Sequence, residues 1–117
     1  MGLREYMACM DSGDPTSALE HLADDVEYVL ALPGRAERGH SRADFAGYIG
    51  GRQARDRVHN VLHHHRDGDV EIVYGVVTEA GEPTGAFLSA ARLDDQGLIA
   101  RYHSSFDTEL FVAELRR

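Results

Sequence analysis

Apolar residues near the start of the chain recur at the spacing of an amphipathic helix. They stand at positions i, i+3, i+4 and i+7 of one stripe, formed by Leu3, Tyr6, Met7 and Met10. Gly13 is predicted to end this helix, because glycine adopts the left-handed cap conformation without steric cost. Asp14 then suits the N-cap of a second helix, which stops at a turn at Asp24–Asp25. The pattern predicts two short helices in succession.

A β-type run and a third helix follow. Val26–Leu32 has the composition of a strand, and Arg35–His40 is predicted to be a polar loop. Ser41 with Asp44 three residues later is typical of a capping box, with Asp in place of the usual Glu. The buried stripe of the third helix is then formed by Phe45, Tyr48 and Ile49.

The rest of the chain has the pattern of strands joined by tight turns. The predicted strands are Val58–Arg66, Val70–Thr78, Thr84–Leu93 and Leu98–Phe106. Asp67–Gly68 is a strong hairpin signal, and Gly81 and Gly97 mark the other two turns. Three hairpins in succession make an antiparallel meander, and Asp107 begins a short amphipathic tail. Residues 1–117 are therefore predicted to form one α+β domain, with the helices first.

Composition narrows the classes of partner and compartment. Twelve basic residues against twenty acidic ones give a formal charge of −8, which repels a nucleic-acid backbone. No apolar stretch approaches the length of a membrane span, and the N-terminus lacks the pattern of a secretory signal. The lone Cys9 cannot form an internal disulfide. These features predict a cytoplasmic protein that binds neither nucleic acid nor membrane.

Several short motifs follow one another along nearly the whole chain. They are Tyr6 with Asp11–Ser12–Gly13–Asp14, Leu22–Ala23–Asp24–Asp25–Val26, Gly39–His40–Ser41, Asp67–Gly68–Asp69, and Asp95–Gln96–Gly97–Leu98–Ile99 leading into Ser105–Phe106–Asp107. Their order and spacing resemble the nuclear transport factor 2-like superfamily, in its SnoaL-like and ketosteroid isomerase-like branch. The resemblance implies a cone-shaped, cystatin-like α+β fold in which three N-terminal helices pack on a strongly bent, mostly antiparallel sheet. It implies no single reaction, because this fold hosts isomerases, hydrolases, cyclases, dehydratases and binding domains.

The resemblance can be carried to individual site residues. Tyr6 matches the tyrosine with which ketosteroid isomerases polarise a carbonyl. The position of their general base falls at about Leu30, and that of their late-strand acid at about Ser89. Leucine cannot accept a proton, so the ketosteroid isomerase mechanism is not expected. Asp107 resembles a closing acid that some SnoaL-like proteins use as an acid/base and that in others caps the tail helix.

The limonene epoxide hydrolase branch is matched still less well. Its middle-strand Arg–x–Asp pair would fall at about Val73–Tyr74–Gly75. Its last-strand acid would fall near Ser104, which cannot replace a carboxylate. Epoxide hydrolysis by that mechanism is therefore not expected either.

Alternation along the strands predicts which side chains line a pocket. Successive side chains of a strand face opposite sides of the sheet. The predicted ligand-binding residues are Tyr28, Leu30, Tyr48, Phe87, Ser89, Tyr102, Ser104 and Phe106. An apolar cup with phenols and hydroxyls suits a small hydrophobic molecule that carries an oxygen. The alternative for Tyr28 and Tyr102 is a structural role as core aromatics with hydrogen-bonded tips.

The chain contains seven histidines, and several lie in one predicted strand. Alternation places His59, His63 and His65 on one face and His64 on the other. His–x–His on a strand can chelate zinc, but a further ligand would have to come from a neighbouring strand. We favour the alternative of an outer sheet face or a dimer interface, and expect no metal and no cofactor. A single inward histidine could act as a general base, with His63 the first candidate and His59 the second.

Two functions remain open from the sequence. The first is an enzyme that isomerises, cyclises, hydrates or dehydrates a small hydrophobic metabolite by acid/base chemistry, with Tyr6, His63 and Asp107 as catalytic residues. The second is a non-catalytic ligand-binding or dimerisation module of the same fold. In either case the convex face of the sheet should be partly apolar, which predicts a homodimer. That face would be formed by Val70, Ile72, Leu88 and Ala90.

Overall fold

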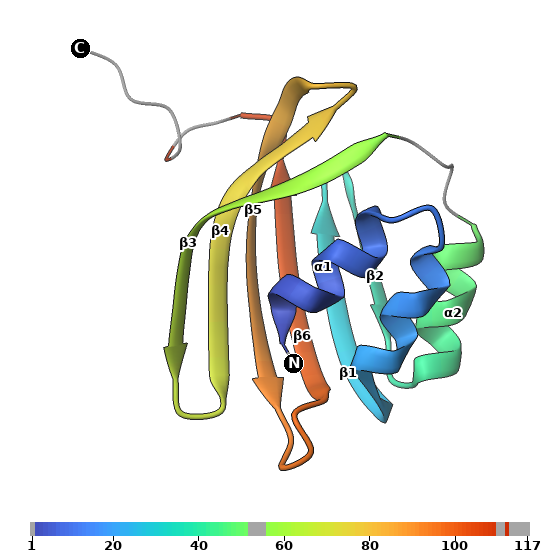
Figure 1. The fold of residues 1–117 in the computed structure, drawn as a ribbon. Helices are drawn as coiled ribbons and strands as arrows, with labels where there is room; N and C mark the ends of the chain where they lie inside the picture. The colour runs from blue at the N-terminus through green and yellow to red at the C-terminus, as the bar shows by residue number, and fades with distance from the viewer. Residues whose placement is uncertain (1, 52–55, 110–111, 113–117) are drawn as a thin grey trace.

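The computed structural model describes residues 2–51, 56–109 and 112 of the chain (Figure 1). Its helical elements are the α-helix α1 (Leu3–Asp11), the 3₁₀ helix η1 (Pro15–His21) and the α-helix α2 (Arg42–Gly50). Its strands are β1 (Leu22–Leu32), β2 (Arg35–Gly39), β3 (Arg57–Asp67), β4 (Val70–Glu79), β5 (Glu82–Leu93) and β6 (Ile99–Asp107). The predicted α+β class is confirmed. None of the described helices is long and apolar enough to span a membrane.

All the described strands belong to one sheet, in the order β2-β1-β6-β5-β4-β3. The strands β3 to β6 form the predicted antiparallel meander. The strand β1 pairs antiparallel with β2 and parallel with β6, so the sheet is mixed but mostly antiparallel. Its hairpin turns contain glycines with positive φ, Gly68 at 62° and Gly97 at 79°.

Two predictions for the segment before α2 are wrong. Asp24–Asp25 does not form a turn, because β1 already begins at Leu22 and contains both residues. Arg35–His40 is not a loop, since Arg35–Gly39 forms β2 and pairs with β1. The strand β2 is an edge strand with mostly exposed side chains, so it lacks the apolar alternation by which a strand is recognised. The predicted capping box of α2 is present, with Ser41 Oγ accepting the Asp44 N–H at 3.0 Å.

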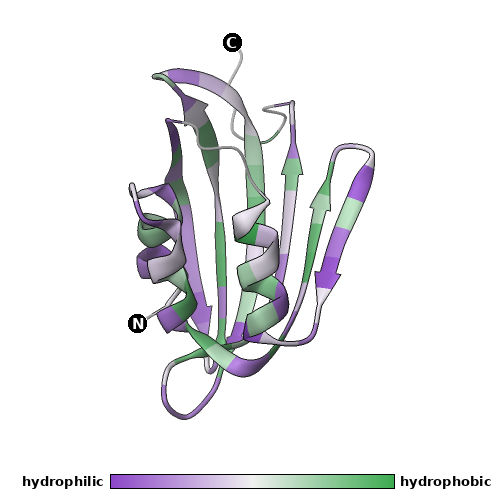
Figure 2. Ribbon diagram, turned by 90° about the vertical axis from the view of Figure 1, so that its right-hand side faces the viewer, coloured by the Kyte–Doolittle hydropathy of each residue, from purple (hydrophilic) through white to green (hydrophobic). Residues whose placement is uncertain are grey.

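The helices cover one face of the sheet. The helix α1 contacts β3 and β4, and α2 packs on β1 and β2. Both helices lie on the side of the sheet that faces the viewer in Figure 1. Hydrophobic and hydrophilic residues alternate along the strands (Figure 2). As predicted, Tyr28, Leu30, Phe87 and Tyr102 are buried on the inner face. Ile72 and Leu88 lie on the outer face, with 40% and 50% of their surfaces exposed.

A β-bulge in β3 changes which histidines face the helices. Val61 pairs with Gly75 and His63 pairs with Tyr74, so Leu62 is an extra residue that reverses the alternation. The inner-face histidines are therefore His59 and His64. The predicted common face of His59, His63 and His65 is wrong, because His63 and His65 lie beyond the bulge and are exposed.

The two inward histidines help carboxylates hold both ends of α1. At its start, Glu71 of β4 accepts the Leu3 N–H at 2.7 Å and a hydrogen bond from His64 Nε2. At its end, Asp11 accepts the His59 N–H at 2.7 Å and contacts His59 Nδ1 at 2.6 Å. We call these contacts the Glu71 clamp and the Asp11 clamp. They fix the helix α1 against the inner face of the sheet.

Loss of the Glu71 clamp should destabilise the fold. Glu71→Ala leaves the Leu3 N–H and the His64 ring without their acceptor, and an unsatisfied buried donor costs about 2 kcal/mol. We expect a decrease of that size in the free energy of unfolding measured with urea. Glu82→Ala, at an exposed position of β5, is the matched control and should change stability little. Equal effects of the two substitutions would contradict the clamp.

Candidate functional site

A cavity of about 750 Å³ lies between the helices and the inner face of the sheet. The helix α1 contributes Tyr6, Met7 and Met10 to its wall, and α2 contributes Tyr48. Each described strand adds at least one residue. Its size is in the range of pockets that enclose a small organic molecule.

Most of the predicted ligand-binding residues lie in the wall of this cavity. They are Leu30, Tyr48, Phe87, Tyr102, Ser104 and Phe106, and Tyr6 joins them. Tyr28 and Ser89 face the same side of the sheet but do not reach the cavity. The Tyr28 ring packs edge-on against Phe45 at 4.9 Å, and Ser89 is completely buried behind Tyr102 and Ser104.

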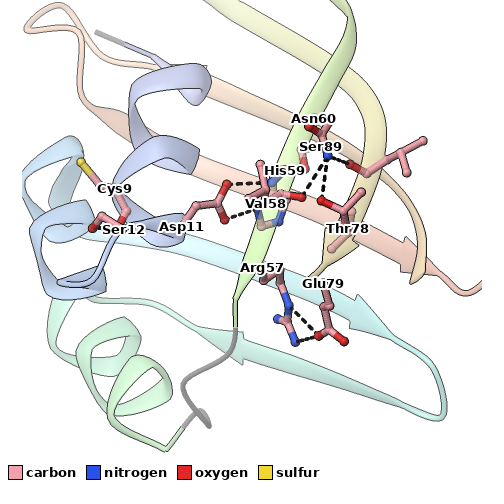
Figure 3. Close-up of polar contacts among 12 residues, drawn as sticks. Cys9, Asp11, Ser12, Arg57, Val58, His59, Asn60, Thr78, Glu79 and Ser89 are labelled. Atoms are coloured by element: carbon pink, nitrogen blue, oxygen red, sulfur yellow. Dashed lines mark hydrogen bonds and ion pairs between the residues drawn. The ribbon is translucent and has the colours of Figure 1, made fainter. Parts of the chain in front are cut away.

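His59 lies in the cavity wall and is held by Asp11, which does not itself line the cavity. Asp11 extends from the end of α1 to His59 of β3 (Figure 3). One carboxylate oxygen lies 2.6 Å from His59 Nδ1, and the other accepts the His59 N–H at 2.7 Å. The side chains are only 13% and 20% exposed, and the ring of Phe87 packs edge-on against the imidazole at 5.0 Å. Both side chains are thus held in one orientation.

This geometry selects a histidine tautomer. Since Asp11 is an acceptor, a neutral His59 carries its proton on Nδ1 and leaves Nε2 with a free lone pair. Among the described residues, Nε2 has no hydrogen-bond partner, and His59 lines the cavity. A bound molecule could therefore give a proton to Nε2, and Asp11 would stabilise the resulting imidazolium.

A group of hydroxyls lies at another part of the wall, with Tyr102 and Ser104 lining the cavity and Ser89 behind them. Ser89 Oγ is 2.8 Å from Ser104 Oγ and 3.4 Å from the Tyr102 hydroxyl. The rings of Tyr6 and Tyr102 meet edge-on at 5.1 Å. Burial raises the pKa of Tyr102, while hydrogen bonds with Ser104, Ser89 and Tyr6 act in the opposite direction and only partly offset it. Tyr102 therefore keeps its proton at neutral pH and can donate a hydrogen bond.

Charged residues in the wall occur as pairs of opposite sign. Arg57 donates from Nε and Nη2 to one oxygen of Glu79, at 3.3 and 3.1 Å (Figure 3). Arg35 Nη1 lies 3.0 Å from Glu37 Oε1. Each of these arginines is balanced by a carboxylate, so the four residues do not favour a strongly charged ligand.

His63 and Asp107 do not lie in the cavity wall. The bulge at Leu62 turns His63 to the outer face, where its ring is 6.4 Å from that of Tyr74. Asp107 is exposed at the end of β6, and its carboxylate accepts the Glu109 N–H at 2.8 Å. The structure thus does not bring the predicted trio of Tyr6, His63 and Asp107 together. Within the described ranges, no group of three or more His, Cys, Asp or Glu side chains is placed to hold a metal ion.

Asp11 is the functional candidate that the sequence analysis missed. The stripe that begins at Leu3 and contains Met7 continues, one turn later, to Asp11. An acid on the buried stripe of a helix needs a partner, and this was the available signal. Its partner, His59, was the second candidate for a general base.

Comparison with known proteins identifies the fold. No family model matches the sequence, and no curated protein matches it. A proposed ketosteroid isomerase from Kribbella flavida DSM 17836 is 23% identical, with 97% of this chain and 76% of that chain covered and a TM-score of 0.70. A proposed isomerase of the SnoaL-like family from Agrobacterium tumefaciens is 15% identical, with 89% of this chain and 92% of that chain covered and a TM-score of 0.72.

A third similar structure is IdmH, a proposed polyketide cyclase from Streptomyces antibioticus. It is 24% identical, with 93% of each chain covered and a TM-score of 0.67. A protein of unknown function from Cytophaga hutchinsonii, described as NTF2-like, also matches, with a TM-score of 0.66. Identities this low show a shared fold rather than a shared reaction. As the sequence motifs predicted, the chain has the fold of SnoaL-like, ketosteroid isomerase-like and NTF2-like proteins.

Proposed function

We propose that the protein is an acid/base enzyme that acts, without a cofactor, on a small, mainly hydrophobic and uncharged molecule that carries a carbonyl oxygen. The observation that carries this proposal is His59 in the cavity wall, held at Nδ1 by Asp11 and with no partner for Nε2 among the described residues. Two of the similar structures are named as a proposed ketosteroid isomerase and a proposed polyketide cyclase, and both names denote enzymes of this chemical class.

The geometry supports a division of roles. Tyr102, with Tyr6 beside it, would donate a hydrogen bond to the carbonyl oxygen of the substrate. His59 Nε2 would remove a proton from the carbon next to that carbonyl, and the electron pair would move to the oxygen as an enolate. Tyr102 would stabilise this oxyanion, and Asp11 the imidazolium. Return of the proton to another carbon completes an isomerisation.

The same enolate permits the other predicted reactions. Loss of a β-hydroxyl, which takes the proton from His59 and leaves as water, is a dehydration. Attack of the enolate carbon on a second carbonyl, which then takes the proton, is a cyclisation. The sequence does not discriminate among these reactions. The competing hypothesis for the catalytic residues is the one predicted from the sequence, in which His63 and Asp107 move the proton.

A binding module remains the second candidate. Leu30, Ser89 and Ser104 stand where relatives with this fold are expected to carry acids, and Leu30 and Ser104 line the cavity. Such a cavity could hold its ligand without turnover. The two functions differ in whether a bound molecule exchanges a proton with the protein.

Replacement of His59 should abolish proton exchange but not binding. Ketones from an aromatic and alicyclic panel that raise the melting temperature would be incubated with the protein in D₂O, and exchange of their α-protons followed by NMR. We expect His59→Gln to lower the exchange rate by at least about a hundredfold, the usual contribution of a general base. Asp11→Asn should also lower the exchange rate.

Matched controls are available at residues outside the cavity wall. His63→Gln changes a histidine of β3 on the other side of the bulge, and Asp107→Asn changes an acid outside the cavity wall. Both variants should catalyse exchange of the ketone α-protons at the wild-type rate. Loss of exchange in these two variants would instead support the roles predicted from the sequence. Ketones that bind the wild type without exchange would favour the binding module.

Tyr102→Phe should also slow exchange, by about a hundredfold, because it removes a donor to the developing oxyanion. Tyr74→Phe, on the outer face, is the control. Since burial raises the pKa of Tyr102 above its ordinary value of 10.0, its phenol keeps the proton throughout the neutral and mildly alkaline range. Ionisation of Tyr102 should therefore not lower the catalysed rate between pH 7 and about pH 9. A decline centred well below pH 10 that disappears in Tyr102→Phe would contradict this.

We also propose that the protein forms a homodimer through the outer face of the sheet. The support is the exposure of Ile72 and Leu88, beside Tyr74, on a face that no described helix covers (Figure 1). Sedimentation velocity at micromolar concentration should give a dimer for the wild type and a monomer for Leu88→Glu. A wild-type monomer under these conditions would remove the proposal.

A further inference from the structure

A second hollow, of about 430 Å³, lies on the sheet face opposite the cavity. It extends over β2, β1, β6 and β5, and Val70 of β4 also lines it. Tyr102 belongs to the lining of both, whereas its neighbours Arg101 and His103 line only this outer hollow. The charged side chains of the outer hollow do not line the cavity, so a role for them does not depend on the proposed enzymatic function.

The strand register explains why this part of the sheet is hollow. One cross-strand row runs from Arg38 through Val29 and His103 to Ala90. The next row contains Glu27, Arg101 and Arg92. Val29 and the small Ala90 are half-buried and form a floor, while the long side chains around them are exposed and form the sides.

The hollow is basic although the chain as a whole is acidic. Its lining includes three arginines, Arg38, Arg92 and Arg101, and one glutamate, Glu27. Arg92 is bound to Asp69 at 2.8 Å. Within the described part of the chain, neither Arg38 nor Arg101 makes a hydrogen bond or ion pair with another side chain. Two uncompensated guanidinium groups thus flank one depression in a protein of formal charge −8.

We propose that this basic groove, defined by Arg38, Arg101 and His103 around Val29 and Ala90, binds a small multivalent oxyanion, either a phosphate group or a pair of carboxylates. Arg38 and Arg101 stand on strands separated only by β1, about 10 Å apart across the sheet, so their flexible side chains can reach one anion from two sides. Guanidinium groups bind phosphate and carboxylate oxygens through two parallel N–H donors. His103, two residues from Arg101 on β6, adds a third donor.

Glu27 gives the proposal an internal check. Its carboxylate lines the same groove, and it stands opposite Arg101 in the register without forming an ion pair. A bound anion is repelled by this carboxylate. Neutralising Glu27 should therefore strengthen binding, whereas neutralising Arg38 or Arg101 should weaken it. A nonspecific effect of net charge would not depend on where the charge is removed.

The test is an NMR titration of the ¹⁵N-labelled protein with inorganic phosphate and, separately, with succinate, at constant ionic strength. We expect saturable shifts of the Val29, Ala90 and His103 amides. Affinity should fall about tenfold in Arg38→Gln and in Arg101→Gln, the loss expected for one charge-assisted contact, and rise in Glu27→Gln. Arg4→Gln, which removes the same charge from an exposed position of α1, should bind like the wild type.

Each outcome decides the proposal. Tighter binding of phosphate assigns the groove to a phosphate group, and tighter binding of succinate to paired carboxylates. The titration is repeated with Leu88→Gln, which adds no charge beside the groove, so that association of copies through the outer face does not hide it. Absence of saturable shifts in both backgrounds overturns the proposal. Shifts that persist unchanged in Arg38→Gln and Arg101→Gln, or that weaken equally in Arg4→Gln, overturn it as well.

Discussion

The extra residue at Leu62 determines which histidines of β3 meet the helix that covers the sheet. Both Asp11 and Glu71 are carboxylates held between α1 and the sheet, where an unpaired charge would be costly. Their partners, His59 and His64, are separated by an odd number of positions, so a regular strand would present only one of them to α1. The bulge turns both inward, and α1 can then be held at its two ends.

The contact that fastens the end of α1 also prepares the site. Asp11 has one oxygen on the backbone N–H of His59 and the other on its ring, so holding the helix and fixing the tautomer are one arrangement. Stability and reactivity are therefore coupled at this point. A substitution of Asp11 changes both the stability of the fold and the orientation of His59. A substitution of Tyr102 changes mainly the group of hydroxyls formed by Tyr102, Ser104 and Ser89. This is why conservative variants and binding controls are needed to separate the two effects.

The parts of this structure that the sequence predicted are those governed by local chemistry. Gly68 and Gly97 mark turns because they adopt backbone conformations that other residues avoid, and alternation placed Phe87 and Tyr102 on the inner face. The bulge was not predicted, because the strand lacks strict alternation on either side of it: His59 and Asn60 are both polar, and Val61 and Leu62 are both apolar. Regular alternation therefore placed His59 and His63 on one face, and His63 was the first candidate. Asp11 was missed for a related reason: its role exists only when β3 lies beside α1.

The position of His59 also limits how a substrate can lie. In the sheet, β3 is separated from β6 by β4 and β5, so His59 and the Tyr102–Ser104 hydroxyls approach the cavity from different strands. Phe87 of β5 lines the space and packs on His59. A substrate that places its carbonyl oxygen at Tyr102 must therefore turn the carbon next to that carbonyl toward His59, on the side of the cavity where Phe87 lies. Leu30, at the position that the resemblance assigns to the acid of ketosteroid isomerases, lines the cavity as an apolar residue, and His59, the proton acceptor of the proposed function, lies instead at the contact between helix and sheet.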